Sequence, residues 1–225
     1  MSYISKIDLS TAPQEIRAVV DNHLAQGYQL TNEKLTLLHN VTAFHTLEES
    51  SYELDRELQR LIGKRAADFY EYAISLQNDC LVCSAYFSRL LEKNHIDFAT
   101  FDFTDDERLL IEYGRAIARD PKHVPEDLMR LMQQTFTEEQ LVVITTMGVF
   151  MIANNYFNDI LNVDPAPVQE NPSSKKTTCS AQPFKSPHAF VLWLTKIKSS
   201  FQDRIFVFRD SSHRSRTCKM PCAIP

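Results

Sequence analysis

The feature that most constrains the fold of this chain is a long succession of helix starts. Thr104 and Glu107 form the Thr-x-x-Glu capping box that opens a helix. Thr137 and Gln140 form a second box of the same kind. Over the first 165 residues, apolar side chains recur at helical spacing, and no stretch shows the period-two alternation of a half-buried strand. The sequence therefore predicts an all-α fold.

The expected helices follow one another with short breaks. They start near Thr11, Thr31, Ser50 and Arg65, then at Asn78 or Asp79, and then at Thr104, Pro125 and Thr137. Gly63 is the expected stop of the third helix. The last helix should run through Leu161, and it is apolar nearly all round in its middle, which is typical of a core or interface helix. A content of 4 glycines and 14 phenylalanines fits a helical fold with a well-filled interior.

Composition and charge divide the chain in two. Residues 162–178 (NVDPAPVQENPSSKKTT) have the Pro, Ser and Lys content of a linker, so we expect an all-helical domain over 1–165. Residues 166–225 should form a basic, Pro- and Ser-rich, poorly structured, flexible tail. The domain holds 14 Lys and Arg against 26 Asp and Glu, whereas the tail holds 10 against 3. An acidic body does not favour nucleic acid as a partner.

The sequence predicts a cytoplasmic protein without a membrane span. Its first residues contain neither an apolar signal region nor a small-residue cleavage site. The longest apolar run, 141–153, is too short to cross a bilayer as a helix. In the cytoplasm, cysteines stay reduced unless they are catalytic or redox-sensing.

Two cysteines three residues apart lie in the stretch QNDCLVCSAYF, residues 77–87. Cys80 and Cys83 would share one face at the start of a helix, where the unpaired N–H groups and the dipole favour a thiolate. Such a pair can form a redox disulfide, or it can be two small buried hydrophobic residues. A zinc site is not favoured, because no second pair of ligands stands at zinc-finger spacing.

The residues around the pair narrow these alternatives. Asp68 stands twelve positions before Cys80, and FTDDERLLIEYGRAIARDPKHV and FTEEQLVVITTMGVFMIANNYFNDILNVD follow. Over roughly residues 30–165, this arrangement resembles the carboxymuconolactone decarboxylase family, specifically its alkyl hydroperoxidase D-like branch. Members carry the pattern Glu-x₁₁-Cys-x-x-Cys-x-x-x-His, an A…DP…V turn and a long apolar last helix. The resemblance implies an all-helical bundle that assembles into trimers or larger rings, with a redox site. We expect neither a cofactor nor a metal.

The resemblance also assigns residues to that site. Cys80 and Cys83 match the thiol pair, and Asp68 matches the acid, one methylene shorter than the usual Glu. Phe87 stands where the family carries its histidine. A phenyl ring cannot accept a proton, and by displacing water it should raise the pKa of Cys83. The proton relay implied by the resemblance is therefore incomplete in this chain.

Three functions follow from this sequence. The first is a thiol–disulfide oxidoreductase or peroxidase-like antioxidant enzyme that cycles Cys80 and Cys83, with a redox protein or a peroxide as partner. The second is a carboxymuconolactone decarboxylase-type lyase, and the third is a non-catalytic oligomeric relative. Three further cysteines lie in the tail with His213, at spacings that fit no common metal site: Cys179, Cys218 and Cys222.

Overall fold

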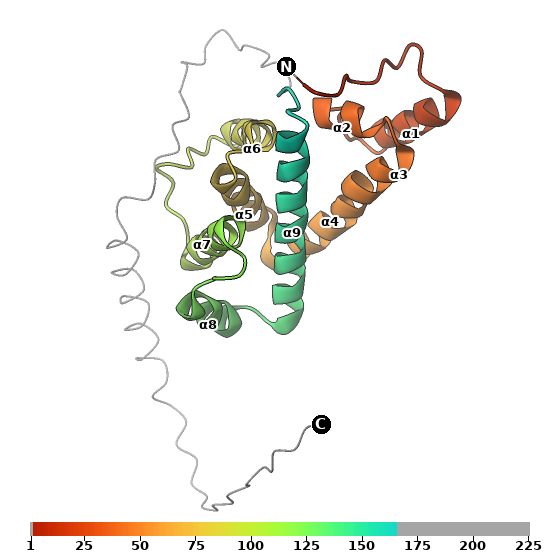
Figure 1. Ribbon diagram of the computed structural model, residues 1–225. Coiled ribbons are helices and arrows are strands. Elements are labelled where there is room, and N and C mark those ends of the chain that lie inside the picture. Colours follow the sequence, from red (N-terminus) through yellow and green to blue (C-terminus); the bar gives the residue numbers. More distant parts are fainter. Residues whose placement is uncertain (1, 166–225) are drawn as a thin grey trace, which may run out of the picture. The chain divides into compact units, whose positions relative to one another are not determined.

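In this computed structural model, residues 2–165 are described, and they form helices joined by short turns, without a strand among them (Figure 1). The elements are α1 (Gln14–Ala25), α2 (Asn32–Leu37), α3 (Val41–Phe44), the π-helix η1 (His45–Glu49), α4 (Ser50–Ile62), α5 (Lys64–Gln77), α6 (Leu81–Lys93), α7 (Asp105–Arg119), α8 (Glu126–Thr135) and α9 (Glu138–Ile160). The predicted all-α class is confirmed. The predicted tail, with its cysteines and histidine, lies outside the described residues.

Helix α5 is the centre of the bundle, because it packs against α4, α6, α7 and α9 (Figure 1). Its middle is buried on all sides, so it presents no solvated stripe. The Tyr70 hydroxyl donates to the carbonyl of Ile144 in α9 at 2.8 Å. Gly148, one turn later in α9, makes room for this ring, since a Cβ atom there would collide with the Tyr70 hydroxyl and with Ile117. The packing of α9 against Tyr70 of α5 thus depends on one glycine.

Helix ends follow the predicted capping chemistry at most positions. Both capping boxes are present, at the starts of α7 and α9. Gly63 ends α4 with a φ of +85°, a conformation that residues other than glycine rarely adopt. Pro125 is the residue before α8 and not part of its first turn, and α9 ends at Ile160, one residue before the predicted end.

The second predicted helix is broken where one continuous helix was expected. α2 ends at Leu37, and the side chain of Asn40 caps a new helix by accepting the N–H of Ala43 at 2.9 Å. The chain then passes through η1 directly into α4, so Ser50 begins α4 without a break. A π-helix makes a wider turn and is often found at functional sites. Here it turns Glu48 into the interior.

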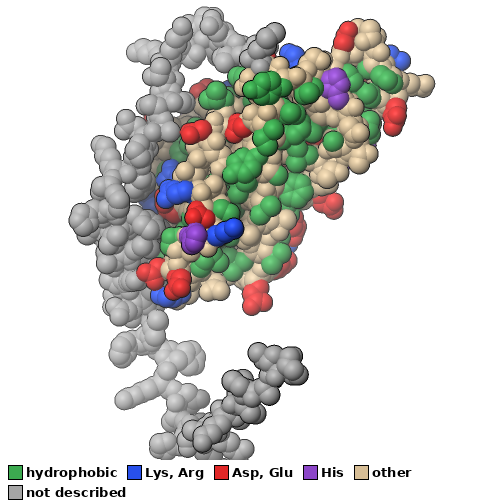
Figure 2. Space-filling view, viewed as in Figure 1, with side chains coloured by type: hydrophobic (Ala, Val, Ile, Leu, Met, Phe, Trp, Pro, Cys, Tyr) green, Lys and Arg blue, Asp and Glu red, His purple; other side chains and the backbone are tan. Residues whose placement is uncertain are grey.

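Helix α9 buries one face and exposes another that is also apolar. Ile144, Met147 and Met151 are among its buried residues. Figure 2 shows apolar side chains gathered over α9. By length and composition alone, α9 is apolar enough to cross a membrane. Four large side chains of its other face are exposed, at Val142, Val149, Tyr156 and Ile160.

Candidate active site

The turn between α5 and α6 positions the cysteine pair. Asp79 adopts a left-handed conformation with a φ of +55°, whereas an N-cap residue needs an extended backbone. Cys80 has that backbone and is the N-cap of α6, so the predicted cap at Asn78 or Asp79 is wrong. The sulfur of Cys80 accepts the backbone N–H of Cys83 at 3.4 Å. A cysteine therefore performs the capping role that Ser or Asp usually fills.

The two thiols differ in acidity because they hydrogen-bond to each other. Both cysteines are free. Hydrogen bonding from Cys83, through its side chain and its backbone N–H, lowers the pKa of Cys80. The same thiol contact, followed by burial, raises the pKa of Cys83. Cys80 is thus the sulfur that ionises first, which makes it the better nucleophile of the pair.

The structure encloses the cysteine pair. Cys80 has an exposed fraction of 0% and Cys83 of 7%. The enclosure is polar on one side, where the side-chain amide of Asn158 in α9 donates to the sulfur of Cys83 at 3.4 Å. Asn158 is itself buried, and its oxygen has no hydrogen-bond partner among the described residues. Tertiary packing of α9 over the start of α6 produces this burial, which helix periodicity does not reveal.

A buried carboxyl group accompanies the pair. Glu33 in α2 is 9% exposed, and burial raises its pKa to about 8, with the charge of Glu48 acting in the same direction. Hydrogen bonding from Asn158 opposes this shift. The start of α2 is held near the end of α9, because the Asn32 side chain donates to the carbonyl of Asp164 at 2.8 Å. Glu33 is therefore neutral near pH 7.

Sequence reasoning missed both Glu33 and Asn158. The Asn-rich end of the last helix is the one signal that pointed toward Asn158. Glu33 follows the Thr31 N-cap and reads as an ordinary first-turn acid that favours the helix dipole. Only the packing of α2 shows that its side chain faces inward.

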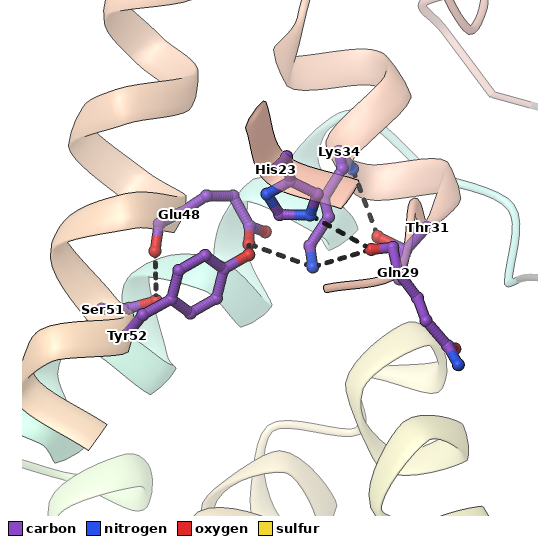
Figure 3. Close-up of polar contacts among 7 residues, drawn as sticks. All are labelled: His23, Gln29, Thr31, Lys34, Glu48, Ser51 and Tyr52. Atoms are coloured by element: carbon purple, nitrogen blue, oxygen red, sulfur yellow. Dashed lines mark hydrogen bonds and ion pairs between the residues drawn. The ribbon is translucent and has the colours of Figure 1, made fainter. Parts of the chain in front are cut away.

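A second polar cluster lies beyond Glu33, between α1, α2, η1 and α4 (Figure 3). The Tyr52 hydroxyl donates to Glu48 at 2.5 Å, and Lys34 forms an ion pair with Glu48 at 3.6 Å. Lys34 also donates to the carbonyl of Gln29, at 3.0 Å, and a ring nitrogen of His23 lies 3.3 Å from the same carbonyl. Glu48 is thus a buried carboxylate with a cation and a hydroxyl in contact.

Asp68 lies in a different cluster from the one around the cysteines. Its carboxylate accepts two hydrogen bonds from Lys64, at 2.9 and 3.1 Å. Burial raises the pKa of Asp68, and it raises that of the neighbouring Glu71 well above the ordinary value. The charge of Asp55 adds to both shifts. The predicted catalytic role of Asp68 stays a prediction, and its described interactions connect it to α4, to α5 and to Tyr86 of α6.

Phe87 occupies the position expected from the sequence, one turn after Cys83. It is buried, and its ring packs against Tyr72 and Tyr86 with centroid distances of 6.3 and 5.1 Å. The pKa of Cys83 is raised; its largest cause is the hydrogen bond with Cys80, and the second is burial. Within residues 2–165, no group of three or more His, Cys, Asp or Glu side chains is arranged to hold a metal ion.

Comparison with known proteins supports the fold. No protein-family profile and no curated protein matches this chain. One similar solved structure is an uncharacterized peroxidase-related protein from Silicibacter sp. TM1040, with 13% identity, a TM-score of 0.56, and coverage of 72% of this chain and 91% of that chain. Another is the alkylhydroperoxidase AhpD core, an uncharacterized peroxidase-related protein from Ralstonia eutropha JMP134, with 20% identity, a TM-score of 0.55, and coverage of 73% and 92%. At these identities the similarity establishes an alkylhydroperoxidase D-like fold, as the sequence predicted.

Proposed function

We propose, for a chain with the alkylhydroperoxidase D-like fold, that the protein is a peroxidase-like thiol–disulfide oxidoreductase that uses Cys80 and Cys83. The observation that supports this most directly is the contact within the pair, in which the Cys83 N–H lies 3.4 Å from the Cys80 sulfur. The two thiols also hydrogen-bond to each other, and a redox pair needs both sulfurs within one turn.

The unequal acidity assigns a role to each sulfur. The Cys80 thiolate attacks the terminal oxygen of a hydroperoxide, the O–O bond breaks, and the alkoxide leaves as an alcohol once it receives a proton. Cys80 is then a sulfenic acid. The Cys83 thiol condenses with it, forming the disulfide and releasing water. A dithiol reductant restores the two thiols and is itself oxidised to a disulfide.

Burial of both sulfurs sets the expected rate. A peroxide reaches Cys80 only when the packing around the start of α6 opens, because this sulfur has no exposed surface. Local opening of this kind costs free energy. We therefore expect a slow peroxidase whose reaction accelerates under mild destabilisation.

The experiment uses a variant in which Cys80 and Cys83 are the cysteines that remain. In full-length protein with serine at Cys179, Cys218 and Cys222, we expect hydrogen peroxide to convert the pair to a disulfide that dithiothreitol reverses. Cys80→Ser should abolish the reaction with peroxide. Cys83→Ser should still form the sulfenic acid at Cys80, yet abolish turnover.

The same assay includes Asp68→Asn, which tests the predicted acid. If Asp68 takes part, Asp68→Asn slows oxidation and shifts the pH dependence of thiol alkylation. If Cys80 and Cys83, in the protein that retains both, react with neither peroxide nor iodoacetamide at neutral pH, the redox function is excluded.

A non-catalytic oligomeric protein is the second candidate, and the burial of both sulfurs together with Phe87 favours it. Phe87→His restores the residue that the alkyl hydroperoxidase D-like pattern carries. A large gain in thiol reactivity in this variant would indicate that the natural protein has lost its relay. An unchanged reactivity would indicate that another group already transfers the proton.

We further propose that copies of the chain associate through the exposed apolar face of α9, defined by Val142, Val149, Tyr156 and Ile160. Exposed large apolar side chains are common singly, but here they share one helix. A second copy presenting the same face would bury them symmetrically.

A further inference from the structure

Peroxide reduction by a thiol pair needs a group that exchanges protons with it. The alkoxide that leaves Cys80 must gain a proton, and Cys83 must lose one as the disulfide forms. Phe87 cannot provide or accept a proton. The inference below rests on the proposed redox function and concerns which residue does so.

Two hydrogen bonds of neighbouring residues and the burial of its own side chain indicate where Glu33 lies. The start of α2 is joined to the end of α9 by the 2.8 Å hydrogen bond from Asn32 to Asp164. The same end of α9 carries Asn158, whose amide contacts the Cys83 sulfur at 3.4 Å. Glu33 follows Asn32 in the chain and is buried, with one carboxyl oxygen that has no hydrogen-bond partner in the described part of the chain. Hydrogen bonding from Asn158 also acts on the carboxyl group of Glu33, so Asn158 connects Glu33 to the cysteine pair.

Glu33 and the cysteines also affect each other electrostatically. The charge of a Cys80 thiolate raises the pKa of Glu33, and the charge of a Glu33 carboxylate raises the pKa of Cys83. By linkage, the two sites compete for protons: when one of them ionises, the other holds its proton more tightly. The favoured state therefore has a protonated Glu33 beside an ionised Cys80. In this state Cys80 can attack the peroxide, and Glu33 can then donate its proton.

Glu48 is a second acidic residue that acts on Glu33, and it belongs to the polar cluster of Figure 3. Glu48 acts on Glu33 electrostatically from η1, and it contacts the Tyr52 hydroxyl at 2.5 Å and the Lys34 ammonium at 3.6 Å. Figure 3 shows these three side chains meeting at one point, with His23 nearby. The side chain of Lys34 is 12% exposed, so this cluster borders the solvent.

Other charges face the pair from α9 and the turn before α6. Asp159 raises the pKa of Cys80, and Asp79 raises that of Asp159. Asp159 opposes thiolate formation at Cys80, but neither Asp159 nor Asp79 is buried as Glu33 is. Lys34, on the same helix as Glu33, lowers the pKa of Glu33 only as a smaller influence.

We propose that Glu33 is the proton-exchanging acid of the Cys80–Cys83 pair, in the role that Phe87 cannot fill, and that Glu48 with Tyr52 and Lys34 connects it to solvent. Glu33 donates its proton to the departing alkoxide and regains one through this cluster. Its pKa of about 8 suits the role, because an acid with a pKa near the operating pH is both largely protonated and ready to donate.

The test separates proton transfer from thiolate formation by measuring two rates on Glu33→Gln. Gln replaces a carboxyl group that is neutral at pH 7, so the fold should be retained, which circular dichroism checks. Oxidation by hydrogen peroxide should slow at least about tenfold, since general acids typically contribute about 10²–10⁴-fold. Alkylation of Cys80 by iodoacetamide needs no proton donor, so its rate should be unchanged at pH 7.

Above pH 8, Glu33→Gln should change the alkylation rate of Cys80 in the direction opposite to its effect on peroxide oxidation. In the wild-type protein, the charge of an ionised Glu33 opposes ionisation of Cys80, because the two charges repel each other. In Glu33→Gln that opposition is absent, so alkylation should be faster than in the wild type and lose its inflection near pH 8. Glu48→Gln should slow peroxide oxidation by less, because it removes the outer carboxylate and keeps the inner acid.

Glu71→Gln is the matched control. Glu71 is also a buried acid with an unpartnered oxygen, but it lies in α5 beside Asp55 and Asp68. In this variant, the ratio of the peroxide oxidation rate to the alkylation rate should equal that of the wild type. Equal loss of both rates in Glu33→Gln, or no change in either, would refute the role of Glu33 while leaving the redox function intact. Inert thiols in the wild type would overturn both proposals.

Discussion

The side-chain amide of Asn158 donates to the sulfur of Cys83 across 3.4 Å, joining the last helix of the domain to the first turn of α6. The contact lies at the point where α9 also meets the start of α2, through the Asn32–Asp164 hydrogen bond. The cysteine pair is therefore enclosed by segments from both ends of the described chain. This enclosure explains why the pair has polar neighbours although it is buried.

Asn158→Ala should slow the second step of oxidation. The amide hydrogen bond lowers the pKa of Cys83, so its loss raises that pKa further and makes Cys83 a poorer attacking thiol. A hydrogen bond worth about 1 kcal/mol corresponds to roughly a fivefold slower disulfide formation. The sulfenic acid at Cys80 should then persist, which dimedone labelling after a peroxide pulse measures. Asn154→Ala, one turn earlier in α9, is the control, and equal labelling in both variants would contradict this prediction.

Stability should fall as the pH rises from about 4.5 to about 8, in part because of Glu33. In the unfolded chain this carboxyl ionises near its ordinary value of 4.5, whereas in the folded protein it stays protonated until its pKa of about 8. Its contribution is complete below pH 4.5 and is lost through that window, at up to about 1.4 kcal/mol per pH unit. Urea unfolding of the wild type and Glu33→Gln at several pH values measures this.

The difference between the two proteins isolates Glu33 from other buried acids, such as Glu71, whose pKa is also raised. The free energy of unfolding of Glu33→Gln should depend less steeply on pH in this window. Parallel curves for the two proteins would show that Glu33 titrates normally in the folded state.

Gly148→Ala should destabilise the domain although alanine favours helices. The added Cβ atom would meet the Tyr70 hydroxyl and the Ile117 side chain at distances that real structures do not show. Overpacking of this kind costs about 1–3 kcal/mol, which thermal unfolding detects. Tyr70→Phe in the Gly148→Ala background removes one of the colliding atoms. A smaller penalty for Gly148→Ala in that background would assign the cost to the hydroxyl, whereas a stable single variant would refute the close approach.

Charges on the exposed face of α9 should change the size of the particle. If copies associate through this face, Val142→Glu with Val149→Glu places carboxylates in an apolar interface and dissociates it. Sedimentation velocity should then show a monomer, while the wild type sediments as an oligomer. Substituting the exposed Leu24 of α1 with Glu serves as the control for a change at an apolar residue outside α9. A wild-type monomer would contradict the association.

The boundaries of most helices could be predicted because they depend on neighbours in the chain. The capping boxes at Thr104 and Thr137 and the stop at Gly63 act within a few residues, so they are visible without a fold. The break between α2 and α3 was missed, since the Asn40 cap competes with a helical apolar pattern that continues through it. The N-cap of α6 was misassigned, because cysteine is rarely considered for that role.

By itself, the sequence determined that the described residues, 2–165, form helices, with two cysteines one turn apart at the start of one of them. The resemblance to the alkyl hydroperoxidase D-like branch also placed Phe87 where that branch carries a histidine. Only the tertiary structure decided that the sulfurs are enclosed, that Asn158 contacts one of them, and that Glu33 is a neutral acid near pH 7. The physical reason is that burial and pKa depend on which side chains from distant segments surround a group, whereas helix periodicity and capping depend on near neighbours in the chain.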